Sequence, residues 1–339
     1  MKILHIIDQK YFVLMERTVT DTIDALDAAG VAQAALCDAE RELPLPVGFQ
    51  ACMKPGFAGT LVNRMAAAKA IKTFDPDVVI RWGAAARQLR LNGKFADVSF
   101  AGMLDDFKDF DRATTVMAND EGTLRAARAH GFSGLKSFVL PPFCAEGKGR
   151  VTLKELFIPE RAAIVFAAGL FAKGAGWEDL FDAFATLRET YFLIQGQGDL
   201  ALAHELSSRA GVKSRCRFVL EIDKTLSLMK LADFAVLTAQ NPEFAKFALF
   251  AARAGIPVLA TEGRKAEEFI EDDKSGFLAP KNDIYLLKKK LHEIEIMDEM
   301  ERARIALVLN EATRMSTAAR AVECILAATY KPATKEALV

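Results

Sequence analysis

The chain has 339 residues, of which 51% are apolar and 26% charged, with 44 basic against 45 acidic side chains. This composition supports about two domains with buried cores, and it excludes a disordered chain and a wholly basic nucleic-acid binder. The five cysteines are scattered without a CxxC pair, which favours a reducing compartment and argues against a zinc site. We find no secretory signal pattern and no run of 18 apolar residues, so we expect a cytoplasmic protein.

The first half of the chain alternates short apolar runs with longer amphipathic segments. Strands are predicted over residues 2–7, 31–36, 78–80 and 139–140, and helices over residues 16–29, 61–74 and 120–130. Pro141 and Pro142 follow the last of these strands and end the pattern. Such alternation predicts a parallel sheet with helices on both faces.

The second half repeats this organisation after a stretch rich in Pro, Gly and charge. Strands are predicted over residues 162–168, 191–194, 217–220, 234–237 and 258–260, and helices over residues 177–190, 199–210, 224–231, 244–254 and much of 286–329. The predicted fold class is α/β, with two doubly wound Rossmann-like domains and a helical C-terminus. The domains are residues 1–145, a linker over 146–160, residues 161–312, and a helix over 313–330 that can return to the first domain.

Five motifs of the second half carry a resemblance to a known family. They are AAGLFAKG (167–174), FLIQGQGDL (192–200), LADFAVLTAQNPEF (231–244), ARAGIPVLAT (252–261) and EEFIEDDKSGFLAP (267–280). In this order and spacing they resemble the nucleotide-sugar-binding domain of retaining glycosyltransferases of family 4, which have the GT-B fold. The resemblance covers residues 160–325 closely and the first half loosely. It implies sugar transfer from a nucleotide-diphosphate donor with retention, without a cofactor or a required metal, and with closure of the two domains over the acceptor.

The resemblance also implies a donor site in the second domain. Its residues are Gly169, Lys173, Gly174, Gly196, Glu243, Ala245, Lys246, Arg264, Lys265 and Glu268. Lys173 would neutralise the leaving diphosphate, Glu243 would lie near the donor sugar, and the amides of Ala245 and Lys246 would face a phosphate at a helix N-terminus. Lys173 as a solvent-facing loop lysine, and the glycines as turn residues alone, are the alternatives.

The chain departs from the family at three polar positions of this site. Ala168 stands where the family has an Arg, and the paired glutamates fall on Pro242 and Phe250. Glu243 can replace the first carboxylate, but Phe250 cannot replace the second. The cations Arg264 and Lys265 either compensate for the missing Arg or are two solvated loop charges. An inactive glycosyltransferase-like scaffold or regulatory partner is therefore the alternative to an enzyme, and an epimerase of the same fold is a third interpretation.

The first domain offers candidates for the acceptor side. Asp8 and Arg17 stand where the family has a Gly-rich loop, although Arg17 can simply open a helix. Arg81 and Trp82 lie at the carboxyl end of a predicted strand, where the indole either stacks on a sugar ring or packs in the core. Asp105 is the candidate polar partner of the donor sugar, unless it is a solvated carboxylate.

A basic segment gives the chain a candidate membrane surface. Residues 52–94 hold eight Lys or Arg and two acids, and residues 56–74 are amphipathic. This pattern indicates either a helix on anionic lipid or an ordinary surface helix. We expect a glycosyltransferase that acts on a surface-glycan or lipopolysaccharide-type acceptor, either free in the cytoplasm or peripheral on the inner face of the cytoplasmic membrane. Its partners would be a nucleotide sugar and a glycan or lipid-linked acceptor, and no nucleic acid, because no recognition motif accompanies the basic segment.

Overall fold

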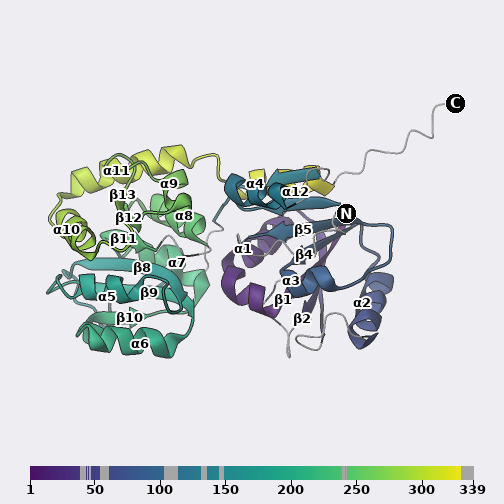
Figure 1. Cartoon of the computed structure of the whole chain (residues 1–339), viewed down its shortest axis with the longest axis horizontal. Helices are drawn as coiled ribbons and strands as arrows, with labels where there is room; N and C mark the ends of the chain where they lie inside the picture. Colours follow the sequence, from purple (N-terminus) through teal and green to yellow (C-terminus); the bar gives the residue numbers. More distant parts are fainter. Residues whose placement is uncertain are drawn as a thin grey trace. The chain divides into compact units, whose positions relative to one another are not determined.

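A computed structural model describes residues 1–38, 43, 45, 47–53, 61–102, 114–130, 136–144, 149–238, 241 and 243–329, apart from the side chains of Asp38, Ile222 and Arg264. The chain forms two compact units (Figure 1). Unit 1 comprises residues 1–143 together with the C-terminal segment from Thr317, and unit 2 comprises residues 144–316. The first unit is therefore built from both ends of the chain.

Unit 1 contains a parallel sheet of seven strands in the order β3-β2-β1-β4-β5-β6-β7. Its strands are β1 (Lys2–Asp8), β2 (Ala32–Asp38), β3 (Phe49–Cys52), β4 (Val78–Trp82), β5 (Ala96–Ala101), β6 (Thr115–Ala118) and β7 (Lys136–Val139). Its helices are α1 (Gln9–Ala28), α2 (Leu61–Phe74), α3 (Ala84–Gln88), α4 (Glu121–Ala129) and α12 (Ala318–Thr329). Strand order reverses on either side of β1, which makes the sheet doubly wound.

Alternate side chains of β1 explain why helices cover both faces of this sheet. Ile3 and Ile7 join one buried cluster, which includes residues of α1 and α12, whereas Leu4 and Ile6 join another, which includes Ala67 of α2. Successive residues of a strand point to opposite faces, so a strand buried on both sides must be apolar throughout.

The start of α1 differs from the prediction. The sequence analysis expects a polar break and a helix from residue 16, but α1 begins at Gln9 directly after β1, because the Asp8 carboxylate accepts a hydrogen bond from the Lys10 amide at 2.9 Å. The helix is kinked at Met15, which has non-helical dihedral angles. The segment predicted as a loop therefore forms the first turns of the helix, and the predicted start coincides with the kink.

Unit 2 contains a parallel sheet of six strands in the order β10-β9-β8-β11-β12-β13. Its strands are β8 (Ile164–Phe171), β9 (Tyr191–Gly198), β10 (Cys216–Phe218), β11 (Phe234–Leu237), β12 (Val258–Thr261) and β13 (Phe277–Ala279). Its helices are α5 (Trp177–Phe184), α6 (Leu200–Arg209), α7 (Thr225–Met229), α8 (Phe244–Ala254), α9 (Arg264–Phe269), α10 (Ile284–Glu295) and α11 (Glu299–Ala312), with short 3₁₀ turns η1 (Lys213–Arg215) and η2 (Ile222–Lys224). The predicted fold class is confirmed by these two doubly wound sheets and the helical C-terminal region.

The core of unit 2 lies on both faces of its central strand, β8. Val165 and Ala167 join a cluster that contains the aromatic residues of α5, and Phe166 and Ala168 join a cluster that contains α8. Because β8 is central, its carboxyl end and those of its neighbours form one edge of the sheet. Among the described residues, no helix is both long and apolar enough to cross a bilayer.

Candidate functional site

The carboxyl edge of the unit 2 sheet is the place where its topology favours a ligand. The chain leaves β8 toward β9 on one side and returns to β11 on the other, so the strand order reverses between β8 and β11. In open parallel sheets, ligands bind outside the carboxyl ends of the strands at such a reversal. The loop after β8 and the N-terminus of α8, which follows β11, both lie at this edge.

Lys173 lies in the loop between β8 and α5 with its side chain exposed. Among the described residues, no hydrogen bond or ion pair engages its ammonium group. The following Gly174 has a φ of +74°, and an added Cβ there would meet no atom within 4 Å. This glycine is therefore required by the backbone turn, and the turn leaves the Lys173 cation open to an anionic ligand.

The first turn of α8 follows β11 and places backbone amide groups at the carboxyl edge of the sheet. Glu243 is the N-cap residue and is 6% exposed, and its amide donates to Asn241 Oδ1 at 2.9 Å. The Glu243 carbonyl accepts from the Lys246 amide at 3.0 Å. The Lys246 amide is thus already bonded within the protein and is not available to a phosphate, which corrects that prediction and leaves Ala245 as the candidate amide. The Lys246 side chain is buried, at 4% exposure.

Two buried polar atoms next to this turn were not identified from the sequence. Thr238 Oγ1 and Asn241 Nδ2 have no hydrogen-bond partner in the part of the chain that the structure describes, although the two residues are only 1% and 4% exposed. Thr238 follows β11 directly, and Asn241 comes three residues later. The signal in the sequence was a Thr and an Asn shortly after a buried strand, where an unsatisfied polar group has a cost unless something else bonds it.

Two of the positions where the sequence analysis expected a departure from polar residues lie in the core. Ala168 is 0% and Phe250 is 1% exposed, and both belong to the cluster between the sheet and α8. Phe250 and Ala168 therefore pack in the core, and neither residue can hold a polar ligand.

Close packing around Gly169 and Gly196, near this edge, leaves little room for a side chain. An added Cβ at Gly196 would lie 2.2 Å from the Gly169 carbonyl oxygen and 2.8 Å from the Phe171 ring. At Gly169 it would meet Thr238 Oγ1 at 3.1 Å and Trp177 at 3.2 Å. Close approach of strands and aromatic rings thus explains Gly169 and Gly196 without a ligand.

The candidate cations of the next loop lie in a helix. Arg264 opens α9, whose N-cap is Gly263. Lys265 is half-buried and Glu268 is exposed, and both have interaction partners within the chain. The segment predicted as a loop is therefore a short helix, because residues 264–269 form α9 between β12 and β13.

Unit 1 uses its predicted acceptor residues for its own structure. Asp8 is 8% exposed, and besides capping α1 it accepts from the Ala85 amide at 3.1 Å. Arg17 is 5% exposed and pairs with Asp21 at 3.0 Å within α1. Asp105 lies outside the described residues.

Arg81 and Trp82 are likewise buried. The Arg81 guanidinium is 3% exposed and binds both carboxylate oxygens of Asp97 at 2.7 Å. Trp82 is 0% exposed, its Nε1 donates to His5 Nδ1 at 3.1 Å, and its ring lies 4.7 Å from that of Phe100. Packing, the alternative for Trp82, is what the structure shows, and neither side chain reaches an acceptor in this arrangement.

Burial also shifts the pKa values of two side chains. The pKa of His5 falls from 6.5 to about 4 because the fully buried ring cannot solvate its charged form. Burial raises the pKa of the Cys216 thiol to about 12, so this cysteine stays protonated and unreactive. The described residues contain no group of three or more His, Cys, Asp or Glu side chains that could hold a metal ion.

Helix α2 carries the described part of the basic segment. Its buried side faces the sheet with Asn63, Ala67 and Ala70. Leu61 and Met65 point outward and are 73% and 65% exposed. The exposed bases Arg64, Lys69 and Lys72 share the helix, which contains no acid. Residues 54–60 of the segment lie outside the described residues.

Most of unit 2 is similar in sequence to a known protein family. Residues 151–308 match the family model of glycosyl transferases group 1. No curated protein sequence matches the chain. The group 1 domain supports the prediction of a glycosyltransferase enzyme.

Solved structures with the same fold cover almost the whole chain. Sucrose-phosphate synthase from Thermosynechococcus elongatus superposes with a TM-score of 0.73 at 16% identity, over 95% of this chain and 96% of that one. Anabaena Alr3699/HepE, solved in complex with UDP and glucose, gives a TM-score of 0.72 at 17% identity, over 96% and 98%. WaaG, a glycosyltransferase involved in lipopolysaccharide biosynthesis, gives 0.71 at 15% identity, over 97% and 100%. At these identities the similarity shows the GT-B fold.

Proposed function

We propose that this chain transfers a sugar from a nucleotide-diphosphate donor to a surface-glycan or lipopolysaccharide-type acceptor, with retention and without a required metal. The observation that carries the proposal is the exposed Lys173, which has no hydrogen-bond or ion-pair partner among the described residues, at the carboxyl edge of a domain that matches the model of glycosyl transferases group 1. Related folds support the donor and acceptor classes, because HepE is solved with UDP and glucose and WaaG acts in lipopolysaccharide biosynthesis.

The transfer breaks the bond between the donor anomeric carbon and the diphosphate oxygen. The acceptor hydroxyl forms the new glycosidic bond on the same face, and its proton passes to the departing phosphate oxygen. Lys173 stabilises the negative charge that develops on the leaving diphosphate, a task that a metal ion performs in other enzymes. Glu243 lies near the donor sugar, and the N-terminus of α8 favours the anionic group electrostatically.

Calorimetric titration with a panel of nucleotide diphosphates and nucleotide sugars tests the donor site. We expect one nucleotide class to bind, and Lys173→Ala to weaken it about tenfold or more, because a charge-assisted contact contributes roughly 1.5–3 kcal/mol. Lys213→Ala is the matched control, since Lys213 is an exposed lysine in η1, which precedes β10 at the opposite edge of the sheet. Equal binding by wild type and Lys173→Ala would refute the site, and no binding across the panel would favour a scaffold without a donor.

Retention and metal independence need a turnover assay. Once the donor is known, we expect unchanged turnover in excess EDTA and a product with the anomeric configuration of the donor, as NMR of the first product would show. Loss of turnover in EDTA, or an inverted product, would contradict this part of the proposal.

We also propose that α2 contacts an anionic membrane surface. Its outward side combines Leu61 and Met65 with Lys72 and no acid, which is the composition that binds anionic lipid. Co-sedimentation should be stronger with vesicles that contain phosphatidylglycerol than with pure phosphatidylcholine. Lys72→Glu should reduce it, whereas Lys136→Glu, at an exposed lysine of β7 in the same unit, should not. Equal loss in both variants would contradict a specific contact through α2.

A further inference from the structure

Two cysteines of unit 1 lie opposite each other on neighbouring strands. Cys37 in β2 is the register partner of Cys52 in β3, and the amide of the next residue, Met53, donates to the Cys37 carbonyl at 2.7 Å. Neighbouring strands lie about 4.7–4.9 Å apart, which is within the range of roughly 4.4–6.8 Å between the Cα atoms of disulfides. The other cysteine in a described strand, Cys216, lies opposite a phenylalanine. Among the described strands, only Cys37 and Cys52 are therefore brought together by a sheet.

The side chains of this pair project to the same face of the sheet. In a parallel pair, register partners share a face, and residues two apart along a strand share it too. Cys37 belongs to the buried cluster of β1 and α1. Gln50, two residues before Cys52, donates from Nε2 to the Leu43 carbonyl at 3.2 Å, and Leu43 packs against the same cluster. The face that holds Cys37 is therefore the one toward which Cys52 points.

The pair combines one accessible and one buried sulfur. Both cysteines are thiols in the structure. Cys52 is exposed, on a strand that ends the strand order beside β2, whereas Cys37 is 0% exposed. A dissolved oxidant reaches an exposed thiol but not a buried one. Cys52 is therefore the sulfur that reacts first, and Cys37 is the neighbouring sulfur that can then attack it.

We propose that Cys52 and Cys37 form a reversible redox-modification site, which a low-molecular-weight disulfide such as oxidised glutathione converts into an internal disulfide. The Cys52 thiolate attacks one sulfur of the small disulfide, which releases one small thiol and leaves a mixed disulfide on Cys52. The Cys37 sulfur then attacks the Cys52 sulfur and releases the second small thiol. Two cysteine thiols lose two electrons and two protons, and one small disulfide gains them as two thiols.

The parallel geometry keeps this bond easy to reduce. Side chains of register partners leave the sheet side by side, so their Cβ atoms stay close to the strand spacing, above the mean of about 3.8 Å in disulfides. Bond formation therefore pulls the edge strand β3 toward β2, and a strained disulfide is reduced more readily. The sequence analysis expects a reducing compartment, where disulfides are typically transient and redox-sensing. The inference does not depend on the proposed glycosyl transfer.

Peptide mapping by mass spectrometry tests the site on the full chain, after incubation in mixtures of reduced and oxidised glutathione and an alkylating quench. The wild type should form a cross-link between Cys37 and Cys52 and lose it in excess reduced glutathione. Cys37→Ala should stop at the mixed disulfide on Cys52, and Cys52→Ser should form neither product. Cys324→Ser is the matched control, at a half-buried cysteine in α12 of the same unit, and should form the cross-link as the wild type does.

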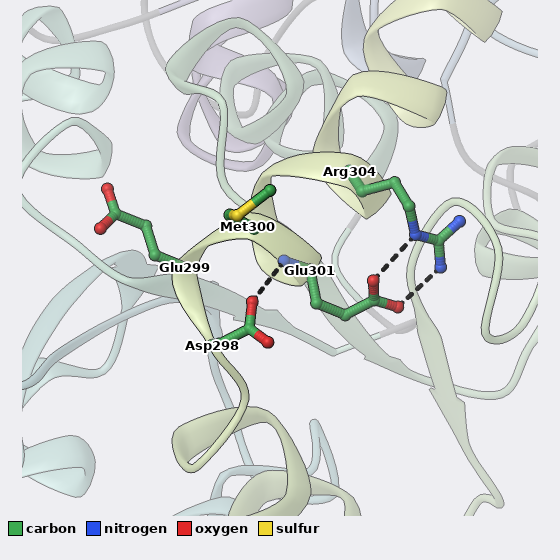
Figure 2. Close-up of a pocket in the computed structure, with 5 residues that line it drawn as sticks. All are labelled: Asp298, Glu299, Met300, Glu301 and Arg304. Atoms are coloured by element: carbon green, nitrogen blue, oxygen red, sulfur yellow. Dashed lines mark hydrogen bonds and ion pairs between the residues drawn. The ribbon is translucent and has the colours of Figure 1, made fainter.

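Glutathione is the better probe than peroxide, because peroxide also oxidises exposed methionines. Met300 at the start of α11 is 84% exposed, and Figure 2 shows its side chain beside those of Glu301 and Arg304 at a surface hollow. A sulfoxide there would change the mass and the stability of the protein without involving a thiol.

Thermal unfolding tests the effect of the bond on the sheet. Oxidation should raise the melting temperature of unit 1 by roughly 5 °C, because the cross-link restricts the unfolded chain between the two strands. Cys52→Ser should melt at the same temperature in both glutathione mixtures. A wild type that keeps only thiols or only the mixed disulfide, a cross-link that survives excess reduced glutathione, or equal melting of the two wild-type forms would each overturn the proposal.

Discussion

The imidazole of His5 lies in a directional chain of hydrogen bonds inside unit 1. Trp82 Nε1 donates to His5 Nδ1, so the proton of the neutral ring is on Nε2, which donates to Gln33 Oε1 at 2.9 Å. Gln33 Nε2 in turn donates to the Ile23 carbonyl at 2.9 Å, which fixes the orientation of the amide. Each partner is satisfied only while the ring is neutral, because a protonated Nδ1 would face the indole N–H.

This arrangement predicts acid sensitivity of unit 1. The folded pKa of about 4 lies below the ordinary 6.5, so the folded state binds fewer protons than the unfolded state between these values. The free energy of unfolding should therefore fall as pH drops from about 6.5 to about 4, by up to about 3 kcal/mol. Urea unfolding of His5→Gln across this pH range should lose this component, whereas His130→Gln, at an exposed histidine, should keep it. Equal slopes in both variants would show that another group is responsible.

The structural role of Arg81 could not be predicted from the sequence, because its partner lies on another strand. An Arg and a Trp at the end of a strand match a sugar-binding edge in residue type and position. The partner of Arg81 is Asp97, sixteen residues away on the neighbouring strand β5, and the pair becomes visible only when β4 and β5 lie side by side. Lys173 and Glu243, by contrast, lie at the edge that their motifs indicate.

Among the elements, length alone did not decide which were predicted, because β11 with four residues was predicted and β5 with six was missed. The predicted bounds of α2, α8 and β11 agree with the structure, whereas β5 and α9 were not predicted. Strand β5 carries the buried polar residues Asp97 and Ser99, and the partner of Asp97, Arg81, is supplied by the tertiary structure. Helix α9 has six residues and is too short to show a period.

The Asp8 carboxylate connects the end of β1 with the starts of α1 and α3, so removing it should destabilise unit 1. Asp8 accepts from the amides of Lys10 and Ala85, so it caps α1 and ties the first turn of α3 to the same point. Asp8→Ala should lower the free energy of unfolding by about 1–2 kcal/mol. Asp8→Asn should cost less than Asp8→Ala, because its one amide oxygen can keep one of the two bonds. Urea denaturation of the two variants measures this, and an Asp8→Ala protein as stable as the wild type would contradict the capping function.

At the scale of the whole molecule, the chain returns to unit 1 after completing unit 2. Helix α12 buries Ala321, Ile325 and Ala328 in the same cluster as β1 and α1, so the core of unit 1 is incomplete until α12 folds. Leu309, fewer than twenty residues earlier, is buried in the core of unit 2 instead. Two neighbouring helices of the C-terminal region thus stabilise different units.

Because α11 and α12 stabilise different units, truncating a buried side chain in each helix should lower the melting temperature of a different unit. Ile325 is 1% and Leu309 is 0% exposed, so replacement of either by Ala should cost about 2–5 kcal/mol through lost burial and a residual cavity. In differential scanning calorimetry, Ile325→Ala should lower the transition of unit 1, and Leu309→Ala that of unit 2. The His5→Gln variant identifies the unit 1 transition independently, because it lies in that unit alone. If both truncations lowered one common transition equally, the two units would unfold as a single cooperative body, and the stability of unit 2 would depend on α12.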